Sequence, residues 1–319
     1  MSIDAIINMV IFMFKYTLDN KRYYTLNYYY KTKYNSKVFK VSLNANFGCP
    51  NKKNGGGCIY CLNGSGENRG MDLIEQFIKV RDIMSKKWPD SKYIGYFQAD
   101  TNTYAPLEVL KENYEKILKL DNVVGLSIAT RCDCLPNDVL DYLEELNKRT
   151  NLTIELGLQT IHETTSKLIN RGHTLKQFEN AVLELRKRNI NVVVHVINGL
   201  PYETKEMMLE TIKYVSHLDI QGIKIHMLFV LKGTELEKLY EKEKFHILTR
   251  EEYVDIVCDE LELLREDIVI NRITGDPDKN LVIEPTWLIK KFGVLNEIDK
   301  EMERRNSYQG IKYKDILDK

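Results

Sequence analysis

Val192-Val193-Val194-His195-Val196-Ile197 is the clearest clue in this sequence to how the chain folds. A nearly unbroken run of β-branched apolar residues is typical of a strand that is buried on both faces, as in a parallel sheet. Comparable runs recur along the chain, at 37–43, 93–98, 123–130, 152–159, 191–198 and 222–230. The sequence therefore predicts six strands of one parallel sheet.

Helical periodicity fills the gaps between these strands. Apolar residues recur at spacings of three and four, with charged residues between them, in the segments 71–87, 106–120, 136–150, 162–188 and 202–218. Strands that alternate with helices form parallel sheets with right-handed crossovers. Six units fit a partial (β/α)6 TIM-like barrel, whereas eight would close it. A doubly wound open sheet is the alternative, but no Gly-x-Gly-x-x-Gly follows the first strand.

The α/β region spans 37–232 and is flanked by two extensions. Residues 1–36 form an N-terminal extension, and 233–319 read as a mainly helical region with helices at 235–244, 250–265 and 285–305. The segment 267–273 is a candidate for one more strand. The apolar stretch 6–14 is too short to span a bilayer and lacks the flanks of a signal peptide. Residues 1–12 can equally be an extension from a misassigned start, with Met13 as the first residue.

Composition narrows the class of protein. Apolar residues make up 43% of the 319 residues, which supports a sizeable core and excludes global disorder. Lys+Arg and Asp+Glu both number 46, so the chain is not a wholly basic nucleic-acid binder. The six cysteines are clustered rather than spread as a disulfide framework, which indicates metal chemistry in a reducing, cytoplasmic compartment.

Three cysteines gather in one glycine-rich loop directly after the first strand: Cys49, Cys58 and Cys61. Thiolates are soft ligands that favour zinc or iron–sulfur clusters. Three ligands would leave one iron of a four-iron cluster open to a substrate or cofactor. The spacing leaves two alternatives: a zinc site completed by Cys132, Cys134 or a distant histidine, and a redox-active Cys58/Cys61 pair.

The Cys-x8-Cys-x2-Cys spacing, with an aromatic residue before the last cysteine, resembles the radical S-adenosylmethionine (SAM) superfamily. The long first gap is typical of the branch that includes the catalytic subunit of Elongator. Further motifs resemble a bacterial family implicated in the modification of tRNA wobble uridines. They lie at 96–106, 155–160, 170–173, 198–204, 232–236, 281–287 and 308–310.

The resemblance implies that Cys49, Cys58 and Cys61 ligate a [4Fe–4S] cluster whose fourth iron binds SAM. Reductive cleavage of SAM would then give a 5′-deoxyadenosyl radical. Four residues would contact SAM: Tyr60 at the adenine, Gln98 at the methionine amine, Glu155 at the ribose hydroxyls and Arg171 at the methionine carboxylate. From the residues alone, Glu155 can be a solvated strand-end acid, Gln98 a satisfied polar core residue, and Arg171 the partner of a helix acid.

The family also implies a substrate and partners. The step would convert a carboxymethylaminomethyl group on the wobble uridine of tRNA to an aminomethyl group. A one-electron reductant such as flavodoxin or ferredoxin and a downstream methyltransferase would be its partners, with no membrane involved. On the substrate side we predict Lys224 and His226, although a histidine there can be structural.

Two basic segments favour RNA. Tyrosines alternate with lysines over 15–40, a composition that suits single-stranded nucleic acid. Lys290, Lys291, Arg304 and Arg305 add positive charge near the C-terminus. The alternatives are that the tyrosines fix the extension onto the barrel and that the C-terminal charges pair within a helix. Two other functions stay open: a radical SAM enzyme for a small metabolite such as a tetrapyrrole, and a non-catalytic, zinc-stabilised RNA-binding protein.

Overall fold

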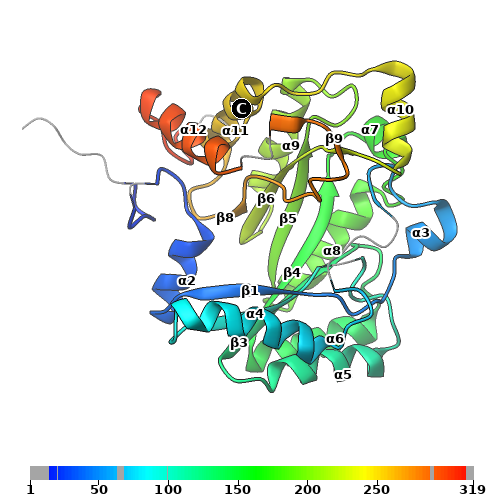
Figure 1. Ribbon diagram of the computed structural model, residues 1–319, viewed down its shortest axis with the longest axis vertical. Coiled ribbons are helices and arrows are strands. Elements are labelled where there is room, and N and C mark those ends of the chain that lie inside the picture. Colours follow the sequence, from blue (N-terminus) through cyan, green and yellow to red (C-terminus); the bar gives the residue numbers. More distant parts are fainter. Residues whose placement is uncertain (1–13, 20, 63–67, 99, 288–290, 314–319) are drawn as a thin grey trace, which may run out of the picture.

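Seven parallel strands form one curled, open sheet in the computed structural model, which describes residues 14–19, 21–62, 68–98, 100–287 and 291–313 (Figure 1). The strand order is β1-β2-β3-β4-β5-β6-β8. The bounds are β1 Val38–Leu43, β2 Lys92–Phe97, β3 Val123–Thr130, β4 Asn151–Gln159, β5 Asn191–Asn198, β6 Gly222–Met227 and β8 Val269–Arg272. The predicted partial parallel barrel is confirmed, and β8 extends it by a seventh strand.

A small antiparallel pair lies beside the main sheet. The predicted strand 222–230 ends at Met227, and the chain then forms β7 (Val230–Leu231), which pairs with β9 (Val282–Glu284). The peptide bond between Glu284 and Pro285 is cis.

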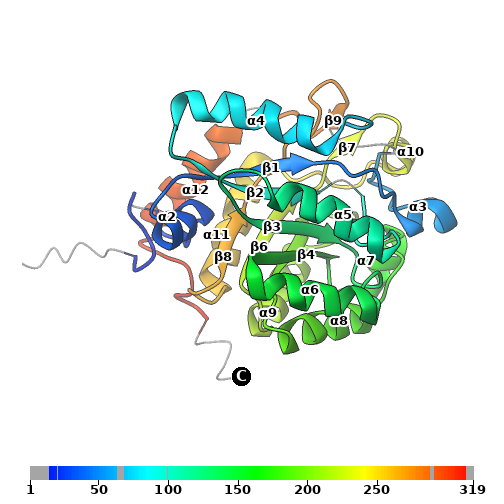
Figure 2. The same ribbon diagram turned by 90° about the horizontal axis from the view of Figure 1, so that it is seen from below.

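Helices cover the outside of the curled sheet (Figure 2). They are α4 Leu73–Lys87, α5 Leu107–Leu118, α6 Asn137–Arg149, α7 Glu163–Leu168, α8 Leu175–Lys187 and α9 Lys205–His217. The single helix predicted at 162–188 is wrong, because the chain breaks between α7 and α8. Asn170 and Gly172 both adopt positive φ there (52° and 75°), a conformation that ends a helix.

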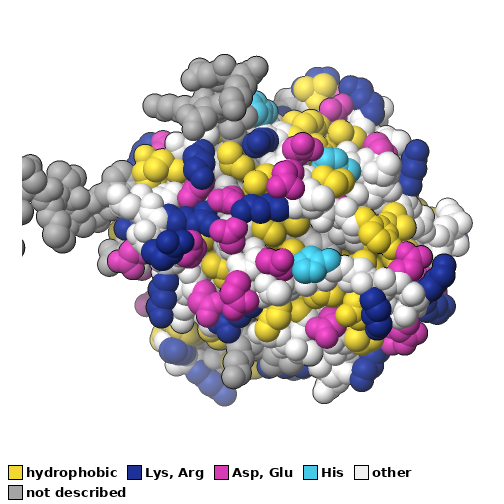
Figure 3. Space-filling model, turned by 90° about the horizontal axis from the view of Figure 1, so that it is seen from above, with side chains coloured by type: hydrophobic (Ala, Val, Ile, Leu, Met, Phe, Trp, Pro, Cys, Tyr) yellow, Lys and Arg dark blue, Asp and Glu magenta, His cyan; other side chains and the backbone are white. Residues whose placement is uncertain are grey.

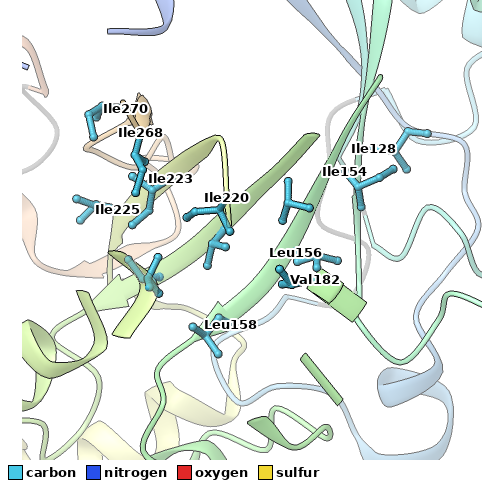
Figure 4. Close-up of a cluster of buried hydrophobic side chains, with 14 of the residues drawn as sticks. Ile128, Ile154, Leu156, Leu158, Val182, Ile220, Ile223, Ile225, Ile268 and Ile270 are labelled. Atoms are coloured by element: carbon cyan, nitrogen blue, oxygen red, sulfur yellow. The ribbon is translucent and has the colours of Figure 1, made fainter. Parts of the chain in front are cut away.

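Side chains alternate between the two faces of the sheet. Along β4, Leu152, Ile154 and Leu156 are fully buried in the core beneath the helices (Figure 4). Glu155 and Gln159, on the opposite face, line a cavity inside the curl. The strands are therefore covered on both sides, as their apolar runs predict, but the inner face carries polar residues.

The N-terminal segment packs between the two edges of the sheet. Helix α2 (Leu26–Tyr34) contacts β1 and β8, and Tyr24 O accepts a hydrogen bond from Ile270 N at 2.7 Å. Tyr23 and Tyr30 are buried. These tyrosines fix the extension onto the barrel, as the alternative interpretation proposed. Residues 1–12, with the question of the start codon, lie outside the described residues.

The C-terminal region holds three helices, α10 (Glu235–Glu243), α11 (Arg250–Leu263) and α12 (Lys291–Arg304). Arg304 and Arg305 pair with acids, chiefly Glu301, and Arg305 also reaches Asp259 at 2.7 Å. These two arginines follow the pairing alternative; Lys290 lies outside the described residues. On the face in Figure 3, basic and acidic side chains are interspersed rather than separated into a basic patch.

Within the described residues, no helix has both the length and the apolar character needed to cross a membrane.

Candidate active site

A cavity of about 340 Å³ opens at the carboxyl ends of the strands. Sites in parallel α/β folds lie at this edge, because the loops that follow the strands converge there. Its walls include most of the residues that the sequence singled out: Cys49, Cys58, Tyr60, Cys61, Gln98, Glu155 and Arg171. Lys224 and His226 lie outside this set. Lys224 is bonded to Glu155 beneath the cavity floor, and His226 lines a neighbouring cavity.

The cysteine loop is built on a short helix, α3 (Pro50–Gly55), whose N-cap is Cys49. Proline suits the first turn of a helix because its missing N–H has no intrahelical partner there. Gly56 and Gly57 follow with φ of 77° and 83°, values that non-glycine residues rarely adopt. This left-handed turn leads the chain back into Cys58 and Cys61.

A second segment holds this loop in place. The Asn170 side chain donates hydrogen bonds to the carbonyl oxygens of Gly55 and Gly57, both at 2.7 Å, and Ile59 N donates to Ile169 O. A Cβ atom on Gly172 would lie 2.4 Å from the side-chain oxygen of Asn51. The 170–173 motif, which the sequence linked to SAM, therefore supports the cysteine loop directly.

The electrostatics of the loop favour a thiolate at Cys58. The hydrogen bond from Cys61 is the main cause that lowers the pKa of Cys58, to about 6, against the opposing effect of burial. Asn51 Nδ2 also donates to Cys58 Sγ at 3.6 Å, which favours the charged form. Hydrogen bonding to Cys58 and burial raise the pKa of Cys61 well above its usual value. Cys58 is thus more readily deprotonated than Cys61 at neutral pH, and the thiolate is the form that binds a metal.

The three thiols fit a multinuclear cluster. Among the residues that the structure describes, no three histidine, cysteine or carboxylate side chains converge on a position for one metal ion. Ligands of a [4Fe–4S] cube bind separate irons, so their sulfur atoms need not converge on one point. Soft thiolates beside an open cavity are the donor set that such a cluster requires.

Two arginines, Arg131 and Arg171, lie in the wall of the same cavity as the thiols. The buried guanidinium of Arg171 donates to the backbone oxygens of Leu158, Thr160 and His173, at 2.6 to 3.1 Å. Glu163 of α7 also approaches it at 3.7 Å, which is the helix-acid pairing left open by the sequence. The guanidinium of Arg171, which the resemblance assigned to the carboxylate of SAM, donates to backbone carbonyls in this geometry.

Arg131 was not singled out by the sequence. Its guanidinium donates to the carbonyl oxygens of Arg171 and Gly172, at 2.8 and 3.0 Å, and forms an ion pair with Asp133. A positive charge beside the thiols also favours the thiolate of Cys58. The sequence could have identified Arg131 by its position directly after β3, because side chains at the carboxyl ends of the strands reach the cavity.

Glu155 is the centre of a buried charge network. Its Oε1 accepts from Lys40 at 2.7 Å and from Ser127 at 2.6 Å, while Oε2 contacts His195 at 2.7 Å and Lys224. Burial raises the pKa of Glu155, but Lys224 and Lys40 outweigh it and hold the pKa well below its usual value. The alternative of a solvated acid is wrong, because Glu155 is fully buried.

Lys224 lies at the base of this network and donates to Tyr96 Oη at 2.7 Å. Burial lowers the pKa of Lys224 to about 7, against the attraction of Glu155. Burial likewise lowers the pKa of His195 to about 4, so this imidazole is neutral at pH 7. The sequence assigned Lys40 to the RNA-binding segment. Its alternation with Phe39 and Val41 was the signal that it faces the interior.

Gln98 and Tyr60 lie on the cavity wall. Gln98 follows the end of β2 and is exposed, so the alternative of a satisfied core residue is wrong. At the rim, Lys52 of the cysteine loop forms an ion pair with Asp100 at 2.7 Å. The sequence gave no indication of this pair, since a loop sequence does not specify where its side chains point.

Cys132 and Cys134 are buried and differ from the loop cysteines. Burial raises the pKa of each thiol to about 12, which keeps both protonated at neutral pH.

Comparison with known proteins identifies the family. Residues 43–215 match the Radical SAM superfamily, and residues 220–304 match the Radical_SAM C-terminal domain. The chain is a radical SAM protein. Members of this superfamily bind a [4Fe–4S] cluster and SAM, which are therefore its cofactors.

Individual relatives place this radical SAM protein in the Elongator-like branch. It is 53% identical to protein YtqA of Bacillus subtilis over 304 residues, covering 93% of this chain and 94% of that protein. It is 30% identical to protein YhcC of Escherichia coli K12 over 275 residues, covering 84% and 88%. A tRNA uridine(34) acetyltransferase of Methanocaldococcus infernus is 24% identical over 208 residues, which is 62% of this chain and 38% of that protein.

The fold agrees with this assignment. A structure of the archaeal Elp3 from Methanocaldococcus infernus superimposes with a TM-score of 0.66 at 18% identity, covering 88% of this chain and 68% of that one. At this identity the likeness concerns the fold alone.

Proposed function

We propose that this radical SAM protein acts on the wobble uridine of tRNA and converts a carboxymethylaminomethyl group to an aminomethyl group. The observation that carries the proposal is the cavity formed by Cys49, Cys58 and Cys61 in a chain of the Elongator-like branch. Relatives named for tRNA uridine(34) modification support the choice of substrate. Their acetyltransferase activity is not part of the proposal, since only 38% of that relative is matched.

In this proposal the three loop cysteines hold the cluster, and Cys58 is more readily deprotonated than Cys61. When bound, the cluster and SAM supply a radical that abstracts a hydrogen atom from an unactivated carbon. Tyr60 and Gln98 would position SAM from the cavity wall. Glu155 and Arg171 would shape its floor, where their contacts with Lys40, Lys224 and backbone carbonyls keep the floor rigid.

The bond that breaks joins the amine nitrogen to the carboxymethyl carbon. That carbon gives up one hydrogen atom to the radical and then one electron, which returns to the one-electron carrier, while the amine nitrogen gives up its proton. Water adds to the resulting C=N bond and releases the aminomethyl uridine and a two-carbon aldehyde carboxylate. His226 would border the substrate, and Lys224 would act from the layer beneath it.

Nucleoside analysis of tRNA from a strain that lacks the gene tests the proposal. We expect carboxymethylaminomethyl uridine to accumulate and the aminomethyl and methylaminomethyl species to disappear. The protein reconstituted anaerobically with iron, sulfide, SAM and reduced flavodoxin should perform the same conversion on that tRNA. An unchanged nucleoside profile would exclude the tRNA assignment.

The small-metabolite alternative is separated by the same reconstituted protein. Substrate-dependent formation of 5′-deoxyadenosine with a tetrapyrrole and without RNA would favour it. The zinc-stabilised RNA-binding alternative predicts bound zinc and no 5′-deoxyadenosine at all. A downstream methyltransferase partner would be indicated if the aminomethyl product is methylated only when that second enzyme is added.

A further inference from the structure

A second cavity of about 280 Å³ lies beside the cysteine cavity. Tyr60 lines both cavities, so the second cavity is adjacent to the cysteine cavity. The second cavity is bordered by His226, near the end of β6, and by Arg272, the last residue of β8. Segments 227–229 and 275–277 complete most of its wall. Its volume is at the small end of ligand pockets and suits one substituent of a larger substrate.

Arg272 is the distinctive residue of this cavity. It is exposed, and no hydrogen bond or ion pair joins its guanidinium to another residue in the described part of the chain. Other arginines around the barrel interior, such as Arg131 and Arg171, are bonded to backbone or acid oxygens. An arginine left without an anion at the wall of a cavity is suited to bind one from outside.

The acids nearby do not neutralise it. Glu155 has both oxygens engaged by Lys40, Ser127, His195 and Lys224. Asp276 lines the same cavity and interacts with another residue. In the described part of the chain, no ion pair within 4.0 Å joins it to Arg272.

The imidazole of His226, which lines the same cavity, carries no charge at neutral pH. Burial is the main cause that lowers the pKa of His226 well below its usual value, and His195, Lys224 and Arg272 add to it. The His226 ring lies 5.3 Å from that of His195. Among the described residues that line this cavity, Arg272 is therefore the cation, and His226 is a neutral donor or acceptor.

We propose that Arg272 binds the carboxylate of the substrate's carboxymethylamino group and seats this group in the second cavity, beside Tyr60. The inference rests on the proposed function. The planar guanidinium matches a carboxylate with two parallel hydrogen bonds, which a point charge does not provide. The aminomethyl product has lost this carboxylate and carries an ammonium group, which Arg272 repels. One residue thus favours the substrate and disfavours the product.

The test compares wild-type protein with Arg272→Gln and Arg272→Lys, each reconstituted anaerobically. The substrates are one tRNA that carries carboxymethylaminomethyl uridine and the same tRNA with aminomethyl uridine. Wild type should bind the first more tightly. Arg272→Gln should abolish this preference and raise KM about 10- to 100-fold, the loss expected for a charge-assisted hydrogen bond. Arg272→Lys should recover part of it.

Two controls separate binding from folding and cofactor chemistry. Iron content and the slow formation of 5′-deoxyadenosine without tRNA should be the same in all variants. Arg81→Gln, which removes an arginine of α4 that forms an ion pair with Asp82, should leave KM unchanged. An Arg272→Gln protein with wild-type KM and preference would overturn the inference and leave the proposed function standing. A wild-type protein that does not convert the nucleoside would overturn both.

Discussion

The cysteine loop and the Glu155 network lie next to each other in one barrel. They differ in whether their polar groups are bonded within the protein or face a cavity. Every oxygen of Glu155 has a partner within the protein, in Lys40, Ser127, His195 and Lys224. The loop instead gathers three unoxidised thiols at a cavity wall. The difference indicates that the Glu155 network stabilises the fold, whereas the cysteine loop is arranged to bind a group from outside the chain.

The sharpest way to break this comparison is Cys58→Ala. We expect the reconstituted protein to lose its iron and its 5′-deoxyadenosine formation completely, because a cluster needs all three local ligands. The free energy of unfolding of the cluster-free protein should change by less than about 1 kcal/mol, since Cys58 contributes little to the core. Iron analysis and urea unfolding measure the two effects.

Cys132→Ala is the matched control for that variant. It removes a buried thiol near the same cavity and should cost about 1 kcal/mol of stability while iron binding persists. Loss of iron in Cys132→Ala would contradict the assignment of the cluster to the loop cysteines alone.

A substitution in the Glu155 network should have the reverse effect and reduce stability. Glu155→Gln leaves Lys40 and Lys224 buried without a counter-charge, and we expect it to reduce the free energy of unfolding by about 3 kcal/mol. Urea unfolding at pH 7 measures this. Glu112→Gln, which breaks an exposed pair with Lys116, should leave the free energy of unfolding nearly unchanged. Equal stabilities of wild type and Glu155→Gln would show that the network does not stabilise the fold.

A second buried carboxyl sharpens the comparison further. Glu260 of α11 is as buried as Glu155, but among the described residues it accepts only from Asn198 Nδ2, at 2.9 Å, and its other oxygen has no partner there. Burial therefore raises the pKa of Glu260 to about 8. Two carboxyls with the same exposure thus differ in charge at pH 7, because only one of them has cations around it.

Glu260→Gln tests this through pH. A carboxyl whose pKa is raised in the folded state contributes stability at low pH and loses it as pH rises from about 4.5 through 8. Glu260→Gln removes that loss. From pH 6 to pH 8, its free energy of unfolding should rise by about 2 kcal/mol relative to wild type. Urea unfolding at both values measures the change, and a constant difference between the proteins would refute it.

Sequence reasoning succeeded where the information is local. The apolar runs predicted the strands, and the cysteine spacing predicted a loop that brings three thiols together at one cavity, because each pattern lies within a few residues. It failed where the curl of the sheet brings distant residues together. Lys40, Glu155 and Lys224 come from β1, β4 and β6, and no spacing in the sequence reveals that they meet. Arg272 escaped notice because it ends a strand that was only a candidate.

The position of α2 has a consequence for the two sheet edges. A sheet that does not close exposes unpaired backbone groups along β1 and β8, which are templates for pairing with another chain. Tyr24 and Thr25 pair with Ile270 of β8, and α2 packs over both edges. The N-terminal segment therefore protects the sheet edges from pairing with another chain. A chain shortened to begin at β1 would expose an unpaired edge strand, at which aggregation can start.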